Sequence, residues 1–367
     1  MDKNSYATLD GESLLKALEG QAVTSGISDL HFAPEKKHVR LEWRLHGVLE
    51  RIADITPVTY EALLRRIKFL SKLKLNITNI PQDGQYTFLA DNRVINVRVA
   101  TLPTRFGEKL TLRLLDPARG IISLEKLGFP GPIAEELRTL VHLPHGIILV
   151  TGPTGSGKTT TLYALLASVV GKNRNIITLE NPIEYEIEGI VQSQIDEDHN
   201  YTFANGLRSV LRHNPDIILV GEIRDLETAQ TAIDASLTGH LVLSTLHTNS
   251  AIEAIPRLLS MGVPPYTFAP ALRAVLAQRM VRTVRTECRK STTPCDPSAN
   301  DTYGGITPLP ELLVIDDQLR QMILQQEQGG EIAKVAKTKG FKTMKEWGNE
   351  FTKEGITTEQ EVNRVTM

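Results

Sequence analysis

The feature that most constrains the fold is a glycine-rich segment that follows an apolar run. Residues 152–159 read GPTGSGKT, which satisfies the pattern G-x-x-x-x-G-K-[ST], and residues 146–151 before them read GIILVT. Between a strand and a helix, such a loop wraps its backbone N–H groups around phosphates at the amino end of the helix. The segment predicts a P-loop, whose nucleotide-binding residues we take to be Gly152, Pro153, Thr154, Gly155, Ser156, Gly157, Lys158, Thr159 and Thr160.

The two polar residues at the end of this loop predict the ligand. Lys158 is expected to neutralise the β- and γ-phosphates of ATP. Thr159 offers a hydroxyl to Mg²⁺, an ion that bridges the same two phosphates in phosphoryl transfer. We therefore expect ATP and Mg²⁺ as the cofactors. The alternative, a fortuitous glycine-rich turn, has a chance of about one in a hundred in a chain of this length.

The elements around the P-loop alternate between strands and helices. Apolar runs at 146–151, 175–180, 190–195, 216–220 and 240–245 predict strands, and helices are expected from Gly157, Phe203 and Glu227. Continuous apolar strands of this kind are typical of a parallel sheet buried on both faces. We expect an ATPase core at 125–260 and a mostly helical C-terminal region at 261–367, with an exposed loop at 291–310.

The N-terminal part has another pattern. Residues 11–24 and 60–76 have apolar side chains at helical spacing, whereas 29–34, 38–45 and 94–102 alternate between polar and apolar residues. This predicts an α/β domain at 1–115, joined by a linker at 116–124.

Composition excludes several classes of protein. The 41 basic and 43 acidic side chains give a net charge of −2, so no global field favours nucleic acid or an anionic membrane. No apolar stretch approaches the roughly 20 residues that cross a bilayer, and the first residues do not resemble a secretory signal. We expect a cytoplasmic protein in which the two cysteines, Cys288 and Cys295, are plain thiols.

Carboxylates at strand ends are the candidates for catalysis. Glu180 and Glu222 end predicted strands, Glu184 follows four residues after the first, and Asp216 begins a strand. Ligands of open α/β sheets bind at the carboxyl edge, so the strand-end glutamates are the favoured pair. His240 and His247 flank the last strand and are further candidates, although a lone histidine is more often structural.

Four segments in order resemble the motor ATPases of type II secretion and type IV pilus assembly. GPTGSGKTTTLY from Gly152, ITLENPIEY from Ile177, NPDIILVGEIRD from Asn214 and TGHLVLSTLHTN from Thr238 are similar to that family's Walker A, aspartate box, Walker B and histidine box. The resemblance extends over nearly the whole chain. It implies an N-terminal α/β (PAS-like) domain followed by a RecA-like P-loop domain with a helical C-terminal portion.

The resemblance also implies roles for single residues. Glu180 would polarise the attacking water, and Glu222 would support Mg²⁺ or share that role. His240 and His247 occupy the histidine-box positions. Arg98 and Arg113 match arginines that approach the phosphates when the site closes, and Arg279 and Arg282 are additional candidates.

The family further implies a homo-hexamer that drives pilus assembly or type II secretion through an inner-membrane platform protein, at the inner face of the cytoplasmic membrane. The chain begins at the second N-terminal domain of longer members, so docking through a first one is not expected. The Cys-x-x-Cys pairs of many members do not occur here, which argues against structural zinc, and Asn181 replaces the usual aspartate.

Other functions stay open. A pilus retraction or DNA-uptake motor is a close variant. A RecA-like nucleic-acid translocase would need basic and aromatic surfaces, which 5% aromatic residues and balanced charge do not suggest, so no nucleic-acid partner is expected. A nucleotide-binding regulatory module that hydrolyses slowly is the third alternative.

Overall fold

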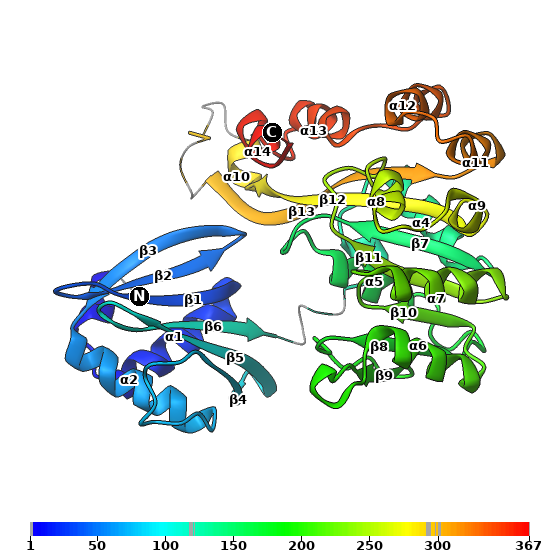
Figure 1. The fold of residues 1–367 in the computed structure, drawn as a ribbon. Coiled ribbons are helices and arrows are strands. Elements are labelled where there is room, and N and C mark those ends of the chain that lie inside the picture. Colours follow the sequence, from blue (N-terminus) through cyan, green and yellow to red (C-terminus); the bar gives the residue numbers. More distant parts are fainter. Residues whose placement is uncertain are drawn as a thin grey trace. The chain divides into compact units, whose positions relative to one another are not determined.

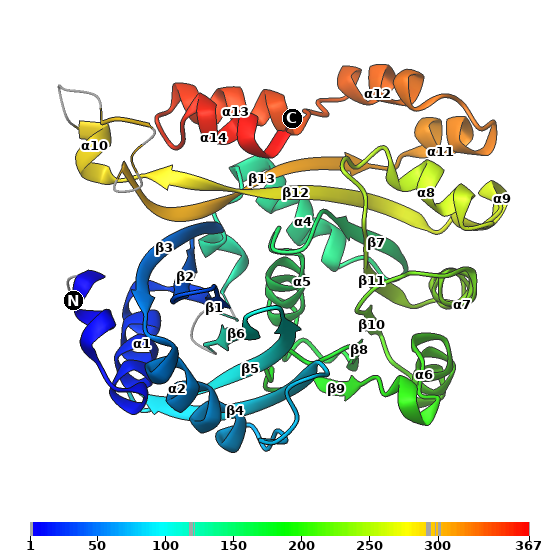
Figure 2. The ribbon, with the colours of Figure 1, turned by 60° about the vertical axis from the view of Figure 1, so that its left-hand side comes forward.

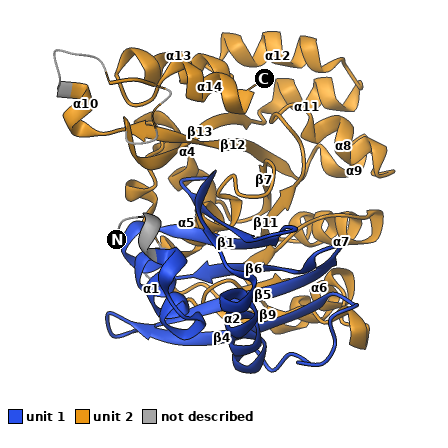
Figure 3. Ribbon diagram, turned by 90° about the vertical axis from the view of Figure 1, so that its left-hand side faces the viewer, with its two compact units in different colours: residues 1–120 blue, residues 121–367 orange. Residues whose placement is uncertain are grey.

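The apolar side chains gather in two separate cores. The computed structural model describes residues 3–116, 120, 122–290, 295–297, 299 and 302–366. The chain divides into two compact units, residues 1–120 and 121–367, which Figure 3 colours separately. Each unit has its own cluster of buried apolar residues. The mixed α/β fold class is as predicted, whereas the finer boundaries at 115, 124 and 260 remain proposals.

Unit 1 is a six-stranded antiparallel sheet whose strands lie in the order β3-β2-β1-β6-β5-β4. Helices α1 and α2 pack against each other on one face of it (Figure 2). Its elements are η1 (Lys3–Thr8), α1 (Gly11–Ser25), β1 (Ile27–Pro34), β2 (Val39–Leu45), β3 (Val48–Ile55), α2 (Pro57–Leu70), β4 (Gln82–Ala90), β5 (Arg93–Thr104) and β6 (Gly107–Leu115).

Local sequence explains where these elements begin and which face they bury. The Asp10 carboxylate accepts hydrogen bonds from the N–H groups of Glu12 and Ser13 and caps α1, which ends at Gly26 in the left-handed conformation. In β5, the alternate residues Ile95, Val97 and Val99 are buried. The alternation in 29–34, 38–45 and 94–102 thus correctly predicts strands.

Unit 2 is a seven-stranded sheet whose strands lie in the order β13-β12-β7-β11-β10-β8-β9, parallel except for the β12–β13 pair. Helices α4 and α5 cover one face and α6 and α7 the other (Figure 2). The elements up to β11 are η2 (Leu124–Lys126), α4 (Gly131–Val141), β7 (Gly146–Thr151), α5 (Lys158–Ala167), β8 (Ile176–Glu180), β9 (Val191–Gln194), η3 (Glu197–His199), α6 (Phe203–Val210), η4 (Leu211–His213), β10 (Ile217–Val220), α7 (Leu226–Leu237) and β11 (Leu241–Leu246).

The central strands β7, β10 and β11 are buried at every position, as the continuous apolar runs predict. Because these strands are parallel, their carboxyl ends meet at one edge of the sheet. The segments that leave β7, β8, β10 and β11 at that edge carry the motif residues, so the sheet brings together residues far apart in the sequence.

The part of the chain after Asn249 is less helical than expected. Two long strands, β12 (Leu272–Val284) and β13 (Tyr303–Val314), extend the sheet (Figure 1). The expectation of a loop at 291–310 is wrong for 303–310, which pair with β12, whereas residues 291–294, 298, 300 and 301 lie outside the described residues. The helices of this part are α8 (Ala254–Ser260), α9 (Pro265–Phe268), α10 (Thr286–Lys290), α11 (Asp317–Leu324), α12 (Gly329–Thr338), α13 (Met344–Lys353) and α14 (Glu359–Thr366).

The expectation of plain thiols is also wrong. Cys288, which lies in α10, forms a disulfide with Cys295, and their Cα atoms are 5.6 Å apart. The two cysteines are seven positions apart in the sequence, and their Cα separation is within the range that a disulfide requires. Within the described residues, no helix is both long enough and apolar enough to cross a membrane.

Candidate functional site

The glycine-rich loop leaves the carboxyl end of β7 and enters α5 at Lys158. Gly152 has φ = +146° and Gly157 has φ = +85°, values that side chains disfavour. A Cβ atom on Gly152 would lie 2.6 Å from the carbonyl oxygen of Gln278 and 2.6 Å from the hydroxyl of Ser156. Both conformation and space therefore require glycine at position 152, and the loop lies tightly against β12.

Lys158 folds back over this loop. Its Nζ donates to the carbonyl oxygens of Gly152 at 2.8 Å and Pro153 at 3.1 Å. Burial lowers the pKa of Lys158, and the nearby Glu222 carboxylate opposes that shift. The ammonium group thus lies at the mouth of the loop, where it would be available to an anion that competes with two neutral carbonyls.

A hollow of about 160 Å³ lies at the carboxyl edge beside Lys158. It brings together most of the strand-end residues that the sequence singled out. Its lining residues are Lys158, Thr159, Leu162, Glu180, Asn181, Pro182, Glu184, Phe203, Leu219, Gly221, Glu222, Thr245 and His247. A second, larger hollow of about 470 Å³ adjoins Gly152, Pro153 and His247 on the loop that follows β11.

Glu180 ends β8 and is buried, with only 4% of its surface exposed. Its carboxylate accepts hydrogen bonds from three side chains. The Thr178 hydroxyl donates to Oε1 at 2.5 Å, the Gln192 amide donates to Oε1 at 3.1 Å, and the Tyr163 hydroxyl donates to Oε2. Burial, followed by the charge of Glu180, raises the pKa of Tyr163, which therefore remains a donor at neutral pH. This network fixes the carboxylate in one orientation at the wall of the hollow.

Glu222 follows β10 and is the more accessible of the two glutamates, with 14% of its side chain exposed. Its Oε2 pairs with Nε of Arg224 at 2.6 Å and lies 3.6 Å from Nε2 of His247. His247 itself is half-exposed. The carboxylate therefore has cationic or titratable neighbours on one side and the hollow with Lys158 on the other.

The structure does not bring His240 to this edge. His240 precedes β11, its carbonyl oxygen accepts from the N–H of Gly146 at the start of β7, and its ring Nδ1 contacts the Ala235 carbonyl at 2.9 Å. His247 follows the same strand. With a rise of about 3.3 Å per residue, a six-residue strand separates the two histidines by roughly 20 Å.

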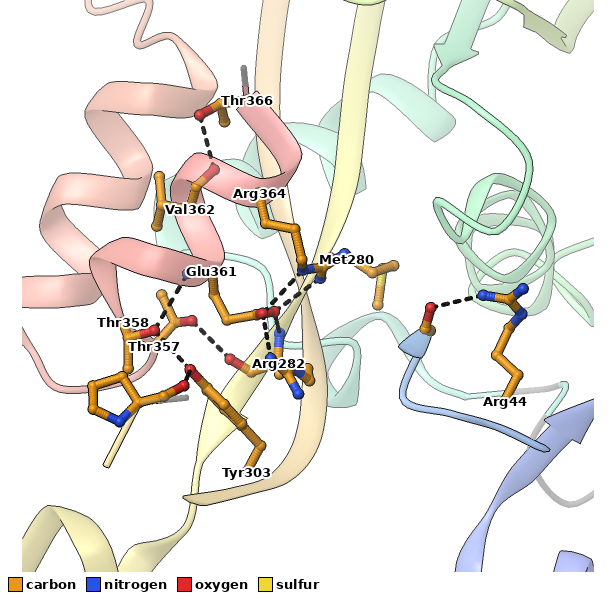
Figure 4. Close-up of polar contacts among 12 residues, drawn as sticks. Arg44, Met280, Arg282, Tyr303, Thr357, Thr358, Glu361, Val362, Arg364 and Thr366 are labelled. Atoms are coloured by element: carbon orange, nitrogen blue, oxygen red, sulfur yellow. Dashed lines mark hydrogen bonds and ion pairs between the residues drawn. The ribbon is translucent and has the colours of Figure 1, made fainter. Parts of the chain in front are cut away.

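The two additional arginine candidates have different surroundings. Arg279 on β12 donates to the carbonyl of Asn249 at 3.2 Å and to its side chain at 3.1 Å, and it is close enough to lower the pKa of Lys158. Arg282 instead pairs with the buried Glu361 at 2.7 Å and stacks over the ring of Tyr303 (Figure 4). Arg279 adjoins the P-loop region, whereas Arg282 is part of a structural cluster.

Arg98 and Arg113 belong to unit 1, where they are directly paired across β5 and β6. Nε of Arg113 donates to Oδ1 of the buried Asp29 at 2.8 Å, and about half of its side chain remains exposed. The two arginines thus form one basic pair on a sheet.

The residues at the hollow fit the predicted metal. Mg²⁺ in nucleotide sites takes one or two protein oxygens and completes its shell with phosphate oxygens and water. Thr159 is exposed in the hollow, and Glu222 lines it with an accessible carboxylate. Among the described residues, those of the hollow included, no group of three or more His, Cys, Asp or Glu side chains could hold a metal ion without such outside ligands.

Sequence reasoning missed three residues that hold these groups in place. Tyr163 and Gln192 contact Glu180, and Gln278 contacts the P-loop. Tyr163 is five residues after Lys158 in the P-loop helix, and that spacing was the available signal. Gln278 lies on a strand that the sequence analysis expected to be helical.

This fold and loop define a RecA-like P-loop ATPase. Comparison with known proteins gives the family: the model described as "Type II/IV secretion system protein" matches residues 9–364, and the chain belongs to that family. It is 43% identical over 369 residues to the type II secretion system protein HxcR of Pseudomonas aeruginosa, covering 98% of this chain and 78% of that one. It is 44% identical over 385 residues to the type II secretion system protein E of Dickeya dadantii, covering 98% and 77%.

Solved structures agree. The pilus retraction motor PilT with bound ADP is 28% identical, with a TM-score of 0.67 and coverage of 97% of both chains. The ATPase DotB of Legionella pneumophila has a TM-score of 0.74 at 24% identity, covering 97% and 96%, and this likeness concerns the fold alone. The chain is thus a motor ATPase of the secretion and pilus class.

Proposed function

We propose that this chain is a hexameric, Mg-ATP-hydrolysing motor that drives type II secretion or type IV pilus assembly through an inner-membrane platform protein. The observation that carries the proposal is that one hollow at the carboxyl edge is lined by Lys158, Thr159, Glu180, Glu222 and His247 together. The similarity to type II secretion proteins over 98% of the chain supports the choice of machine.

In this proposal, the P-loop binds the phosphates of ATP. Lys158 exchanges its two carbonyl partners for phosphate oxygens, and the backbone N–H groups of the loop donate to the same anion. Thr159 and Glu222 would hold Mg²⁺, which neutralises charge on the β- and γ-phosphates when bound. His247, beside Glu222, would donate a hydrogen bond to a phosphate or to that carboxylate.

Glu180 is proposed to accept a hydrogen bond from the attacking water and so to polarise it. Its three donors keep the carboxylate fixed, and it lines the same hollow as Lys158. Glu222 would share this role or support the metal. His240 is proposed only for an indirect role, because it contacts the end of α7 at the amino edge.

Arg98 and Arg113 are proposed to stabilise the phosphates after closure of unit 1. A cation that arrives only after closure couples domain motion to hydrolysis. Such coupling in a ring would turn hydrolysis into work on the platform protein, and the motor would then act at the inner face of the cytoplasmic membrane.

Retraction is the second candidate, supported by the 28% identity to PilT. An experiment in the host distinguishes assembly or secretion from retraction. The gene is deleted, and wild type or Lys158→Ala is then expressed in its place. An assembly or secretion motor predicts loss of surface fibres or of secreted protein with Lys158→Ala. Accumulation of surface fibres with that variant would instead support retraction and contradict the proposal.

The ring is tested by phosphate release across a size-exclusion profile. We expect activity in the hexamer-sized fraction and little in the monomer fraction. Full activity in the monomer would contradict the ring, ATP binding without turnover in any fraction would favour a regulatory module, and strong stimulation by DNA would favour a nucleic-acid translocase.

A further inference from the structure

A buried glutamine on β12 connects two elements of the P-loop region. Gln278 is 0% exposed. Its Nε2 donates to the carbonyl oxygen of Ser156 at 2.6 Å, and its Oε1 accepts from the Thr161 hydroxyl at 3.0 Å. The carbonyl of Ser156 can only accept, so the NH₂ group must face the loop, and both ends of the amide are used.

This contact determines which way one peptide group of the P-loop faces. In a planar trans peptide, the carbonyl of one residue and the N–H of the next point in opposite directions. With the Ser156 carbonyl turned toward Gln278, the N–H of Gly157 is turned away from β12. An N–H group at this point of a P-loop is one of those that cradle phosphate.

The glycines of the loop are packed against the same side chain and strand. A Cβ atom at Gly157 would lie 3.0 Å from Nε2 of Gln278, and one at Gly152 would lie 2.6 Å from the Gln278 carbonyl oxygen. Gln278 therefore occupies the space behind the loop, and its amide NH₂ group donates to the Ser156 carbonyl there. Replacement by an apolar side chain of the same length would keep the volume and leave that buried carbonyl without this donor.

We propose that Gln278 is a positioning residue for nucleotide binding: it holds the Ser156–Gly157 peptide with its N–H toward the phosphates of a nucleoside di- or triphosphate. This role rests on the proposed assignment of the P-loop as the nucleotide site. The hydrogen bond from Gln278 to Ser156 also connects the P-loop to β12, the strand that carries Arg279. Gln278 contacts no phosphate itself, and it acts through the backbone of the loop.

The test compares Gln278→Met with wild type by titration of the 367-residue chain with a fluorescent ADP analogue. Methionine is unbranched and similar in size, but it has no N–H donor. We expect the dissociation constant to rise at least tenfold. The matched control is Val281→Ala, a cavity-forming change at a 0% exposed position on the opposite face of the same strand. It is expected to lower the melting temperature while it leaves the dissociation constant within about twofold of wild type.

Thr161→Val is the second variant and is informative even if Gln278→Met does not fold. It removes the donor that fixes the other end of the amide, and we expect at least threefold weaker binding. Folded Gln278→Met or Thr161→Val proteins that bind like wild type would overturn the role, as would an equal loss in Val281→Ala. If wild type itself binds no nucleotide, the proposed site fails together with this role.

Discussion

At the scale of single residues, the hydroxyl of Tyr163 donates to Oε2 of Glu180, whereas Thr178 and Gln192 donate to Oε1. We predict that Tyr163→Phe lowers kcat roughly tenfold, the equivalent of about 1.4 kcal/mol, because Oε2 of Glu180 loses the donor that fixes it. The KM for ATP should change little, since Tyr163 is not among the phosphate-binding residues. Steady-state phosphate release measures both constants.

A kcat of Tyr163→Phe within about twofold of wild type would contradict this role. It would show that Tyr163 only fills space in the core.

Single residues also show the limits of prediction from sequence. The position of Glu180 and Glu222 at one edge was predictable, because carboxyl ends of parallel strands meet there. The contact of Gln278 with Ser156 was not, since the two residues are 122 positions apart in the sequence and meet only because β7 and β12 are neighbours in the sheet. Motif resemblance grouped His240 with His247, yet β11 places them at opposite edges.

At the scale of elements, a charged cluster joins the last helix, α14, to β12. The 1% exposed Glu361 accepts from Arg282 at 2.7 Å and from Arg364 at 2.8 Å (Figure 4). Burial alone would raise the pKa of Glu361, but hydrogen bonds from Arg364 and Arg282 lower it to about 2. The charged cluster explains in physical terms why α14 packs against β12, because an unpaired buried carboxylate would be costly there.

Glu361→Gln should lower the free energy of unfolding at pH 7 by about 3 kcal/mol, since it leaves two arginines without their shared partner. The folded-state pKa lies below the ordinary value of 4.5, so the stabilisation is present above pH 4.5 and is lost as the pH falls toward 2. The difference between the two proteins should shrink over that window. Urea unfolding at several pH values measures it.

The matched control is Glu331→Gln, because Glu331 pairs with the exposed Lys334 on α12 at 2.7 Å. An exposed pair contributes about 0–1 kcal/mol, so this variant should be nearly neutral. Equal losses in both variants, or a pH-independent loss in Glu361→Gln, would contradict the proposed contribution of the buried cluster.

A helix or strand could be predicted from the sequence where its apolar pattern was clear. The strands of the core have continuous apolar runs, and 146–151 matches β7 at both ends. Strand β12 was missed because LRAVLAQRMVRTV is rich in leucine, alanine, glutamine, arginine and methionine, which favour helices. Its pairing with β7 on one side and β13 on the other overrides that preference. In β13, Pro308 and Pro310 hid the strand signal.

At the scale of the whole molecule, unit 1 has a core built from its own residues, including Leu14, Phe32 and Leu63. We predict that residues 1–116 expressed alone fold cooperatively.

Lys68→Met in this fragment should lower the free energy of unfolding by about 3–5 kcal/mol, because it leaves the 4% exposed Glu108 without its ion-pair partner at 2.7 Å. Circular dichroism during urea titration tests both statements, and a non-cooperative transition in the unmodified fragment would contradict the first.

The central claim is that Mg-ATP is hydrolysed at the P-loop of unit 2. The most direct measurement is Mg-dependent phosphate release by wild type, Lys158→Ala and Glu222→Gln, with Lys345→Ala as an exposed lysine control in the same unit. We predict that removal of Mg²⁺ abolishes turnover, that Lys158→Ala and Glu222→Gln each lower it at least about 100-fold, and that Lys345→Ala has no effect. Turnover by Lys158→Ala within about twofold of wild type would contradict the account.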